Sequence, residues 1–164
     1  MKILIVKIGI VGLSSEELKE LTESIENAFP KVSCSVSDVV IPLPDEAFNK
    51  RRGQYYSPLI LEKLAAHAEE FGLERVLGIV DVDLYVPGLN FIFGEAECPG
   101  RVALISLVRL RNEFYGLEPD LRLFMERVKK EAIHELGHTF GLSHCGNLRC
   151  VMRFSNSIAD TDEK

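Results

Sequence analysis

The sequence lacks a long hydrophobic run, an excess of basic residues, internal repeats and low-complexity linkers. No stretch approaches the roughly 20 consecutive apolar residues that a transmembrane helix needs. Acidic residues outnumber basic ones by 25 to 19, which gives a net charge of -6. Nucleic acids and anionic membranes select basic surfaces, so this balance argues against both as main partners. We therefore expect a protein that acts without nucleic acid and without a membrane.

No secretion signal is readable at the start of the chain. Residues 1–13 are apolar, but Lys7 interrupts them and no small-residue cleavage site follows. No upstream inhibitory pro-segment is recognisable either. We expect a cytoplasmic monomer. The length of 164 residues suffices for a buried core, so a single domain over residues 1–164 is expected.

Cysteine is scarce, with four residues in the whole chain. A chain without a secretion signal is expected in a reducing compartment, where disulfides are rare. Cys145 and Cys150 lie close together in the sequence. They are therefore interpreted as metal ligands or as plain thiols.

Strand-like and helix-like segments follow one another along the chain. Ser14 and Glu17 have the spacing of a capping box, an apolar stripe follows them, and Pro30 ends the helix. This helix separates two β-branched segments, which predicts a parallel strand pair with a right-handed crossover. The expected strands are 2–11, 32–41, 76–86, 91–97 and 102–110, and the expected helices are 14–29, 57–71 and 118–140.

The short segment 91–97 precedes Pro99, as is typical of an edge strand. The predicted fold class is a mixed α/β domain with a twisted, mostly parallel sheet. One edge strand is antiparallel, and three main helices pack on the sheet.

Two further motifs have both a functional and a structural interpretation. The basic and aromatic run 50–56 can contact a substrate, or it can be a solvated loop that its tyrosines anchor to the core. The second interpretation is favoured. Asp81 and Asp83 can bind a hard cation. A role as polar strand ends or as an anchor for the turn at Pro87 is favoured.

Three of the four histidines lie within residues 134–144, and the fourth, His67, is expected on the surface of its helix. His134 and His138 are one helical turn apart, so both imidazoles project from one face. Neutral imidazole suits Zn²⁺, and Glu135 is placed to hold a metal-bound water without being a ligand. The glycine at position 141 can turn the chain and bring His144 back as a third ligand. Three histidines leave a fourth position open, as in a catalytic zinc site.

The alternative is an amphipathic helix whose histidines are exposed by coincidence. Ordinary residue frequencies make an accidental match to the full pattern improbable in a chain of this length, on the order of 10⁻⁵. The pattern therefore favours a metal site.

The segment from His134 to Met152 resembles the zinc site of the metzincin peptidases. The continuation Cys145, Cys150 and Met152 is similar to the C-x₄-C-x-M sequence of the archaemetzincin (archaelysin) family. The resemblance extends over most of the chain and implies a compact metzincin-like domain. It implies that the three histidines hold a catalytic Zn²⁺ and that Glu135 is the general base and acid. It also implies that Met152 forms the Met-turn beneath the histidines.

The resemblance also implies that Cys145 and Cys150 are two ligands of a second, structural zinc. The family's other two ligands come from a C-x-x-C that residues 1–164 do not contain, so a short C-terminal tail is expected to be missing or the second site lost. The sequence also departs from some metzincins at Phe154, where certain subfamilies have a tyrosine that reaches the metal. Phe154 has no hydroxyl and cannot supply that ligand.

The predicted function is a zinc-dependent metallopeptidase that cleaves peptide or protein substrates through a zinc-activated water. An extended substrate is expected to add as a strand to the edge at 91–97. The alternative is a catalytically weak, zinc-containing module that binds a peptide without cleaving it. Glu135 argues against that alternative, because binding alone needs no base.

Overall fold

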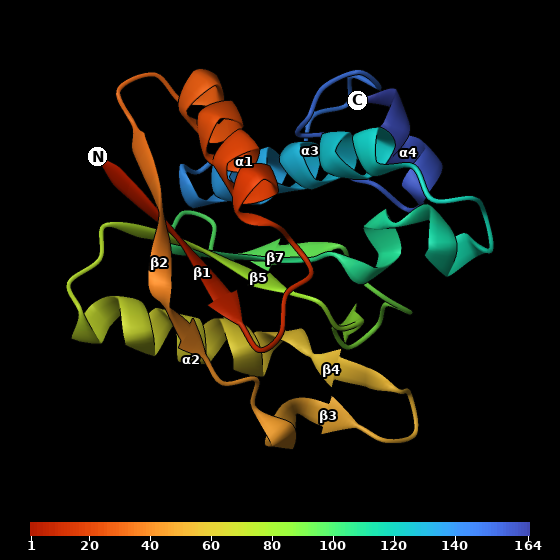
Figure 1. The fold of residues 1–164 in the computed structure, drawn as a ribbon, viewed down its shortest axis with the longest axis horizontal. Coiled ribbons are helices and arrows are strands. Elements are labelled where there is room, and N and C mark those ends of the chain that lie inside the picture. Colours follow the sequence, from red (N-terminus) through yellow and green to blue (C-terminus); the bar gives the residue numbers. More distant parts are fainter.

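The structure is a computed structural model that describes residues 1–164. Helices pack on both faces of a five-stranded sheet (Figure 1). Its order is β2-β1-β5-β8-β7, in which only β7 is antiparallel to its neighbour. The strands of this sheet are β1 (Lys2–Ile8), β2 (Ser33–Ile41), β5 (Arg75–Val80), β7 (Gly94–Ala96) and β8 (Val102–Ser106). The prediction of a mostly parallel sheet with one antiparallel edge strand is confirmed.

Three long helices cover the sheet, as predicted, and the last of them carries His134 and His138. They are α1 (Ser15–Ala28), α2 (Ser57–Glu70) and α3 (Leu121–Thr139). Helices α1 and α3 lie on one face and α2 lies on the other (Figure 1). The core is therefore divided by the sheet into two apolar layers. None of the helices combines the length and the apolar character needed to cross a membrane.

The smaller elements gather around one end of the main sheet. A three-stranded sheet in the order β3-β4-β6 consists of β3 (Phe48–Asn49), β4 (Gln54–Tyr56) and β6 (Leu84–Tyr85). Three 3₁₀ helices span Asp45–Ala47, Val108–Leu110 and Asn112–Tyr115. A short helix, α4 (Ile158–Glu163), packs beside α3 near the C-terminus (Figure 1).

Two predicted strands are shorter than expected for the same reason. The strand expected over 76–86 ends at Val80, and the strand expected over 102–110 ends at Ser106. Beyond these points both segments leave the sheet, and ion pairs join one segment to the other. Asp81 accepts two hydrogen bonds from Arg111, at 2.5 and 2.8 Å, and Asp83 accepts two from Arg109, at 2.6 and 2.8 Å. The two carboxylates are thus paired with arginines just beyond the strand end, which confirms the interpretation as polar strand ends. They hold the segment 109–111 rather than the turn at Pro87, and neither is free for a hard cation.

Candidate active site

Helix α3 supplies four side chains of the site, Glu131, His134, Glu135 and His138, and both of its ends are fixed by local hydrogen bonds. Asp120 caps its start by accepting a hydrogen bond from the backbone N–H of Leu123 at 2.9 Å. At the other end Gly141 adopts φ +88°, the left-handed conformation that glycine tolerates. The N–H of Leu142 then donates to the carbonyl of Gly137 at 3.1 Å, which closes the turn. The predicted glycine turn is confirmed.

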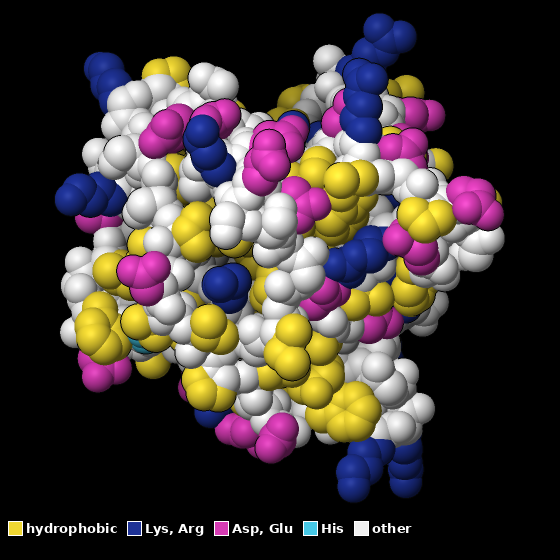
Figure 2. Space-filling model, in the orientation of Figure 1, with side chains coloured by type: hydrophobic (Ala, Val, Ile, Leu, Met, Phe, Trp, Pro, Cys, Tyr) yellow, Lys and Arg dark blue, Asp and Glu magenta, His cyan; other side chains and the backbone are white.

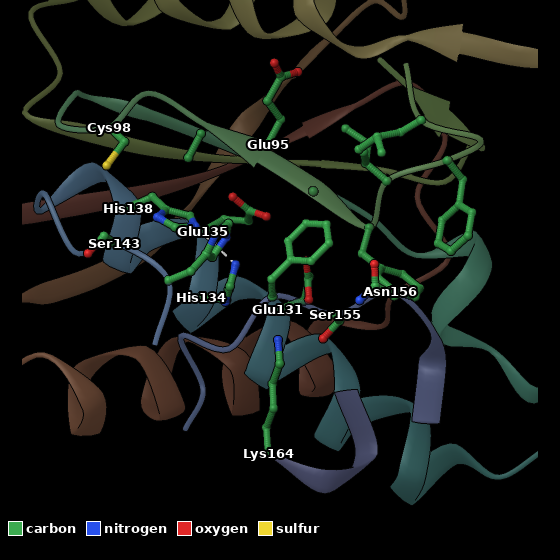
Figure 3. Close-up of a pocket in the computed structure, with 18 of the residues that line it drawn as sticks. Glu95, Cys98, Glu131, His134, Glu135, His138, Ser143, Ser155, Asn156 and Lys164 are labelled. Atoms are coloured by element: carbon green, nitrogen blue, oxygen red, sulfur yellow. Dashed lines mark hydrogen bonds between the residues drawn. The ribbon is translucent and has the colours of Figure 1, made fainter. Parts of the chain in front are cut away.

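The turn brings the third histidine next to the other two. His134, His138 and His144 each offer a ring nitrogen, and these nitrogens all lie within 4.8 Å of one another. Figure 3 shows His134, His138 and Glu135 projecting from α3 into one cleft. The fourth histidine, His67, lies apart, where it packs against Phe71 on α2.

Two of the imidazoles are oriented by backbone carbonyls. The Nδ1 atom of His134 lies 2.7 Å from the carbonyl oxygen of Val151, and the Nδ1 of His138 lies 2.7 Å from that of Leu142. A carbonyl only accepts, so each Nδ1 carries the proton and each Nε2 presents a lone pair. Histidines that ligate a metal through one ring nitrogen usually donate a hydrogen bond from the other ring nitrogen, as Nδ1 does here.

The remaining nitrogens fit a zinc ion. The two Nε2 atoms of His134 and His138 are 3.1 Å apart. In the tautomer in which Nδ1 carries the only ring proton, neither Nε2 has a proton to donate, so two lone pairs converge without a partner. Two nitrogens bound tetrahedrally to one zinc at ~2.0–2.1 Å lie about 3.4 Å apart. The observed spacing of 3.1 Å is thus close to the spacing that a shared cation requires.

Burial favours the neutral form of two of the three rings, His134 and His144. Burial lowers the pKa of His134 to about 3, and the neighbouring Lys164, His138 and His144 act in the same direction. Burial also lowers the pKa of His144, with His138 and Lys164 adding to the effect. Neutral imidazole is the form that ligates a metal.

Glu131 and Glu135 form a buried carboxyl pair on α3, one helical turn apart. Burial raises the pKa of Glu135 well above its usual range, and the adjacent Glu131 raises it further. Burial likewise raises the pKa of Glu131, which is only 4% exposed. Figure 3 shows Lys164 pointing toward Glu131, and the Lys164 ammonium is itself buried without a hydrogen-bond partner.

Glu131 and Lys164 were not predicted as site residues. The i, i+4 spacing of Glu131 and Glu135 was a readable signal, because it places both on one face of a helix. No sequence pattern indicated Lys164, which reaches the cleft only because α4 packs on α3.

Met152 lies beneath the histidine pair, packed on the helix backbone. A Cβ added to Gly137 would lie 2.5 Å from Met152 Sδ, so the glycine makes room for the thioether. Met152 is buried, and its carbonyl accepts a hydrogen bond from the N–H of Cys145 at 2.9 Å. Cys145 and Cys150 are free, half-buried thiols. They do not belong to a cluster of three or more possible metal ligands, as the three histidines do. The Phe154 ring lies 5.2 Å from that of His144.

The three histidines, Glu131, Glu135, Phe154 and Lys164 line one open cleft of about 590 Å³, whereas Met152, Cys145 and Cys150 do not. One wall is the segment 89–96, which includes the edge strand β7, and the other is formed by α3 and the chain that follows it. Glu95 also borders the cleft, but its side chain points away from the histidines (Figure 3) and accepts a hydrogen bond from Ser57 at 2.6 Å. The arrangement combines a metal-binding cluster, a carboxylate and an exposed sheet edge.

Comparison with known proteins agrees with this chemistry. The family model described as peptidase family M54 matches residues 7–164. An archaemetzincin from Pyrococcus furiosus is 46% identical over 168 aligned positions, which span the whole of this chain and 87% of the relative. The crystal structure of an archaemetzincin from Methanopyrus kandleri superposes with a TM-score of 0.82 at 40% identity, covering 100% of this chain and 86% of that one.

A zinc-dependent peptidase from Methanocorpusculum labreanum superposes with a TM-score of 0.86 at 29% identity, covering 98% of this chain and 93% of that one. The family match and the three-histidine cluster support zinc as the metal and peptides or proteins as substrates. The chain belongs to peptidase family M54 and is a zinc metallopeptidase of the archaemetzincin type.

Proposed function

We propose that His134, His138 and His144 hold the catalytic zinc and that Glu135 is the general base and acid, all within a single domain over residues 1–164. The observation that carries this assignment is the close approach of the two Nε2 atoms, at 3.1 Å, while each Nδ1 faces a backbone carbonyl. Each carbonyl favours the tautomer in which Nδ1 carries the proton. Such an arrangement is repulsive until a cation is shared.

When bound, zinc supplies a Lewis acid and lowers the pKa of its water toward ~7. The Glu135 carboxylate takes the proton of that water as the scissile carbonyl is attacked, and it returns the proton to the leaving amine. Burial raises the pKa of Glu135, and a cation at the histidines opposes this rise. These opposing effects suit a group that must both accept and release a proton near neutral pH.

Met152 is proposed to fix the floor of the site. It fills the space that Gly137 leaves open on α3, and the preceding carbonyl of Val151 orients His134. A residue in this position sets the histidine geometry without touching the substrate.

We propose that substrates bind in an extended conformation along the edge at β7. This strand pairs with β8 on one side and has no strand on the other. Its outer edge faces the cleft, so its free backbone groups can pair with a peptide in the manner of β-strand addition. Such a peptide would cross directly above Glu135 and the histidines.

A second, structural zinc at Cys145 and Cys150 is a separate proposal. Both cysteines are free and lie on the loop that leaves α3. Two thiolates do not close a tetrahedral site, so we propose that the site is complete only in a form of the protein that carries a further cysteine pair. Metal analysis tests this: two zincs per chain in the 1–164 form would contradict it.

We further propose a cytoplasmic monomer with no nucleic-acid partner. Four free thiols suit a reducing compartment, and a net charge of -6 opposes both self-association and phosphate binding. The face seen in Figure 2 mixes acidic, basic and hydrophobic side chains and has no continuous basic surface. Light scattering at working concentration and a nucleic-acid retention assay test these two points.

The decisive experiment is peptide-library cleavage by the wild type and by Glu135→Gln. We expect one zinc per chain in both proteins and a loss of about 10²–10⁴-fold in kcat for the variant, the range that general acid–base catalysis contributes. Glu126→Gln on the outer face of the same helix is the matched control and should keep wild-type activity. Zinc binding and peptide binding without any turnover by the wild type would instead favour the peptide-binding module.

A further inference from the structure

The outer wall of the cleft is fixed by side chains that come from a distant hairpin. Segment 89–93 lies outside the main sheet. Its last residues are held by backbone contacts, an isolated bridge between Ile92 and Leu84 of β6 and a hydrogen bond from the N–H of Ser106 to the carbonyl of Phe93 at 2.8 Å. The carbonyl oxygens of Leu89 and Asn90 have no backbone partner. They accept hydrogen bonds only from side chains of the segment 52–54.

Arg52 and Gln54 make these contacts together. The Nη2 of Arg52 donates to the carbonyls of Leu89 and Asn90, both at 3.0 Å, and its Nε donates to Gln54 Oε1 at 2.8 Å. Gln54 is buried, and its Nε2 donates to the Asn90 carbonyl at 2.9 Å. The two side chains therefore grip the same stretch of backbone.

The contacts continue to the far end of the wall. Gln54 Nε2 also donates to Asp83 Oδ2 at 3.0 Å, and Asp83 is in turn paired with Arg109. The Arg109 guanidinium lies 4.1 Å from the centre of the Phe91 ring, a distance at which cation–π attraction is effective. Arg52, Gln54, Asp83 and Arg109 thus form a continuous chain of contacts, here called the brace.

We propose that the brace is a positioning device for substrate binding, which holds segment 89–93 at the separation from α3 that an extended peptide needs. This inference rests on the proposed function. None of the four brace residues lines the cleft, whereas Leu89, Asn90 and Phe91 all do. The brace residues therefore act on substrate only through the wall.

The physical effect is on the free-energy cost of binding. Without its side-chain partners the wall samples conformations in which the cleft is too wide or too narrow. Apparent affinity falls in proportion to the fraction of molecules in the competent conformation. The loss of affinity should appear as a higher KM, and only for peptides long enough to reach the wall. The rate of the chemical step should not change, because the zinc ligands and Glu135 lie on a separate element.

The favoured interpretation of the run 50–56, a solvated loop that its tyrosines anchor to the core, is confirmed for Lys50 and Arg51, which are exposed, and for Tyr55, which packs against the core. The contacts of Arg52 and Gln54 add a role that the sequence did not suggest. Arg52 does not face the cleft, and its guanidinium also lies 4.2 Å from the centre of the Tyr85 ring. Basic side chains project beyond the β3–β4 hairpin in Figure 2, so only part of the run is solvated. Arg52 and Gln54 hold the cleft wall.

The test compares Arg52→Met with Arg51→Met. Methionine keeps the apolar stem but removes the donors, and Arg51 is an exposed neighbour whose guanidinium makes no hydrogen bond or ion pair. For a ten-residue peptide we expect Arg52→Met to raise KM five- to twentyfold, with kcat within twofold and zinc content unchanged. Arg51→Met should match the wild type, and Arg52→Lys should recover part of the loss. A dipeptide-sized substrate should show no difference among the variants.

Equal KM values for Arg52→Met and Arg51→Met on the long peptide would overturn the proposal. A loss that is the same for long and short substrates would also overturn it, since that is what general destabilisation produces. If the wild type cleaves no peptide, the proposed function fails, but the brace is still tested by calorimetric titration with a long peptide hydroxamate. Weaker binding to Arg52→Met than to Arg51→Met then supports the brace, and equal binding overturns it.

Discussion

Gly94 on the edge strand lies directly against Glu135 on α3. A Cβ placed on Gly94 would lie 2.7 Å from Glu135 Cγ, 2.8 Å from its Oε1 and 2.7 Å from the carbonyl oxygen of Leu104. Only hydrogen fits in this space, so the strand that borders the cleft and the base of the reaction are in direct contact. The glycine therefore sets the distance between the expected path of the substrate and the carboxylate.

Gly94→Ala is expected to reduce kcat/KM by at least tenfold while the protein still folds and binds zinc. The added methyl group must displace either the Glu135 side chain or the β7–β8 pairing. Misplacing a catalytic group by about 1 Å can cost about 10²-fold in rate. Steady-state kinetics and zinc content provide the measurement. Gly146→Ala is the control because a Cβ there meets nothing within 4 Å; equal losses in both variants would contradict the prediction.

Gly137→Ala is expected to weaken zinc binding by roughly 10–100-fold, the range seen when groups that support metal ligands are disturbed. The new Cβ would lie 2.5 Å from Met152 Sδ and would push away the segment whose Val151 carbonyl orients His134. Competition with a chelator measures the affinity. Combining the change with Met152→Val should recover part of it, because the smaller side chain vacates the space. No recovery in the double variant would show that the effect arises elsewhere.

Asp162→Ala is expected to lower the free energy of unfolding by about 2 kcal/mol. Arg127 is buried and donates to both oxygens of Asp162, at 2.7 and 2.8 Å, so the change leaves a buried cation short of its partner. Breaking such a pair costs about 3–5 kcal/mol when both ends are buried. A smaller value is expected here because Asp162 is 35% exposed and Arg127 keeps the Leu110 carbonyl and Asn112.

Urea denaturation of the zinc-loaded protein measures this difference. The control is Glu126→Ala, which breaks the exposed pair with Arg122 and should change stability by no more than about 0.5 kcal/mol. Similar values for the two variants would mean that α4 is not held by the Arg127 pair.

Local signals in the sequence predicted the parts of the fold that local contacts stabilise. Ser14 and Glu17 do form both hydrogen bonds of a capping box, at 3.2 and 2.6 Å. Gly141 does take the left-handed conformation that brings His144 to the other histidines. These features need only residues within a few positions of each other, so spacing alone reveals them.

Features that depend on distant partners were missed or misplaced. The strand expected to reach residue 86 ends earlier because Asp81 and Asp83 pair with arginines from another strand's continuation. Helix α4 is short and polar and was not predicted, since it is held through Asp162 by a buried arginine of α3. The close approach of Gly94 to Glu135 is likewise a product of packing between elements, which has no periodic trace in the sequence.

The last prediction concerns the reactivity of the thiols. Burial, together with the charge of Glu26, raises the pKa of Cys34 to about 12. At pH 8 its thiolate fraction is then about 10⁻⁴, compared with about 0.2 for an unperturbed thiol with a pKa near 8.5. The greater nucleophilicity of the more basic thiolate offsets part of this difference.

Cys34 in the native protein should therefore react with iodoacetamide about a hundredfold more slowly than a free model thiol, and it should also lag behind the exposed Cys98. Peptide mapping by mass spectrometry after timed labelling gives both rates. In denaturant the two cysteines should react alike, because burial and the Glu26 contact are lost together. Equal native rates for Cys34 and Cys98 would show that α1 does not shield the thiol on β2. Because the charge of Glu26 raises the pKa of Cys34, Glu26→Gln should make the labelling of Cys34 faster. An unchanged rate in that variant would show that this charge does not contribute.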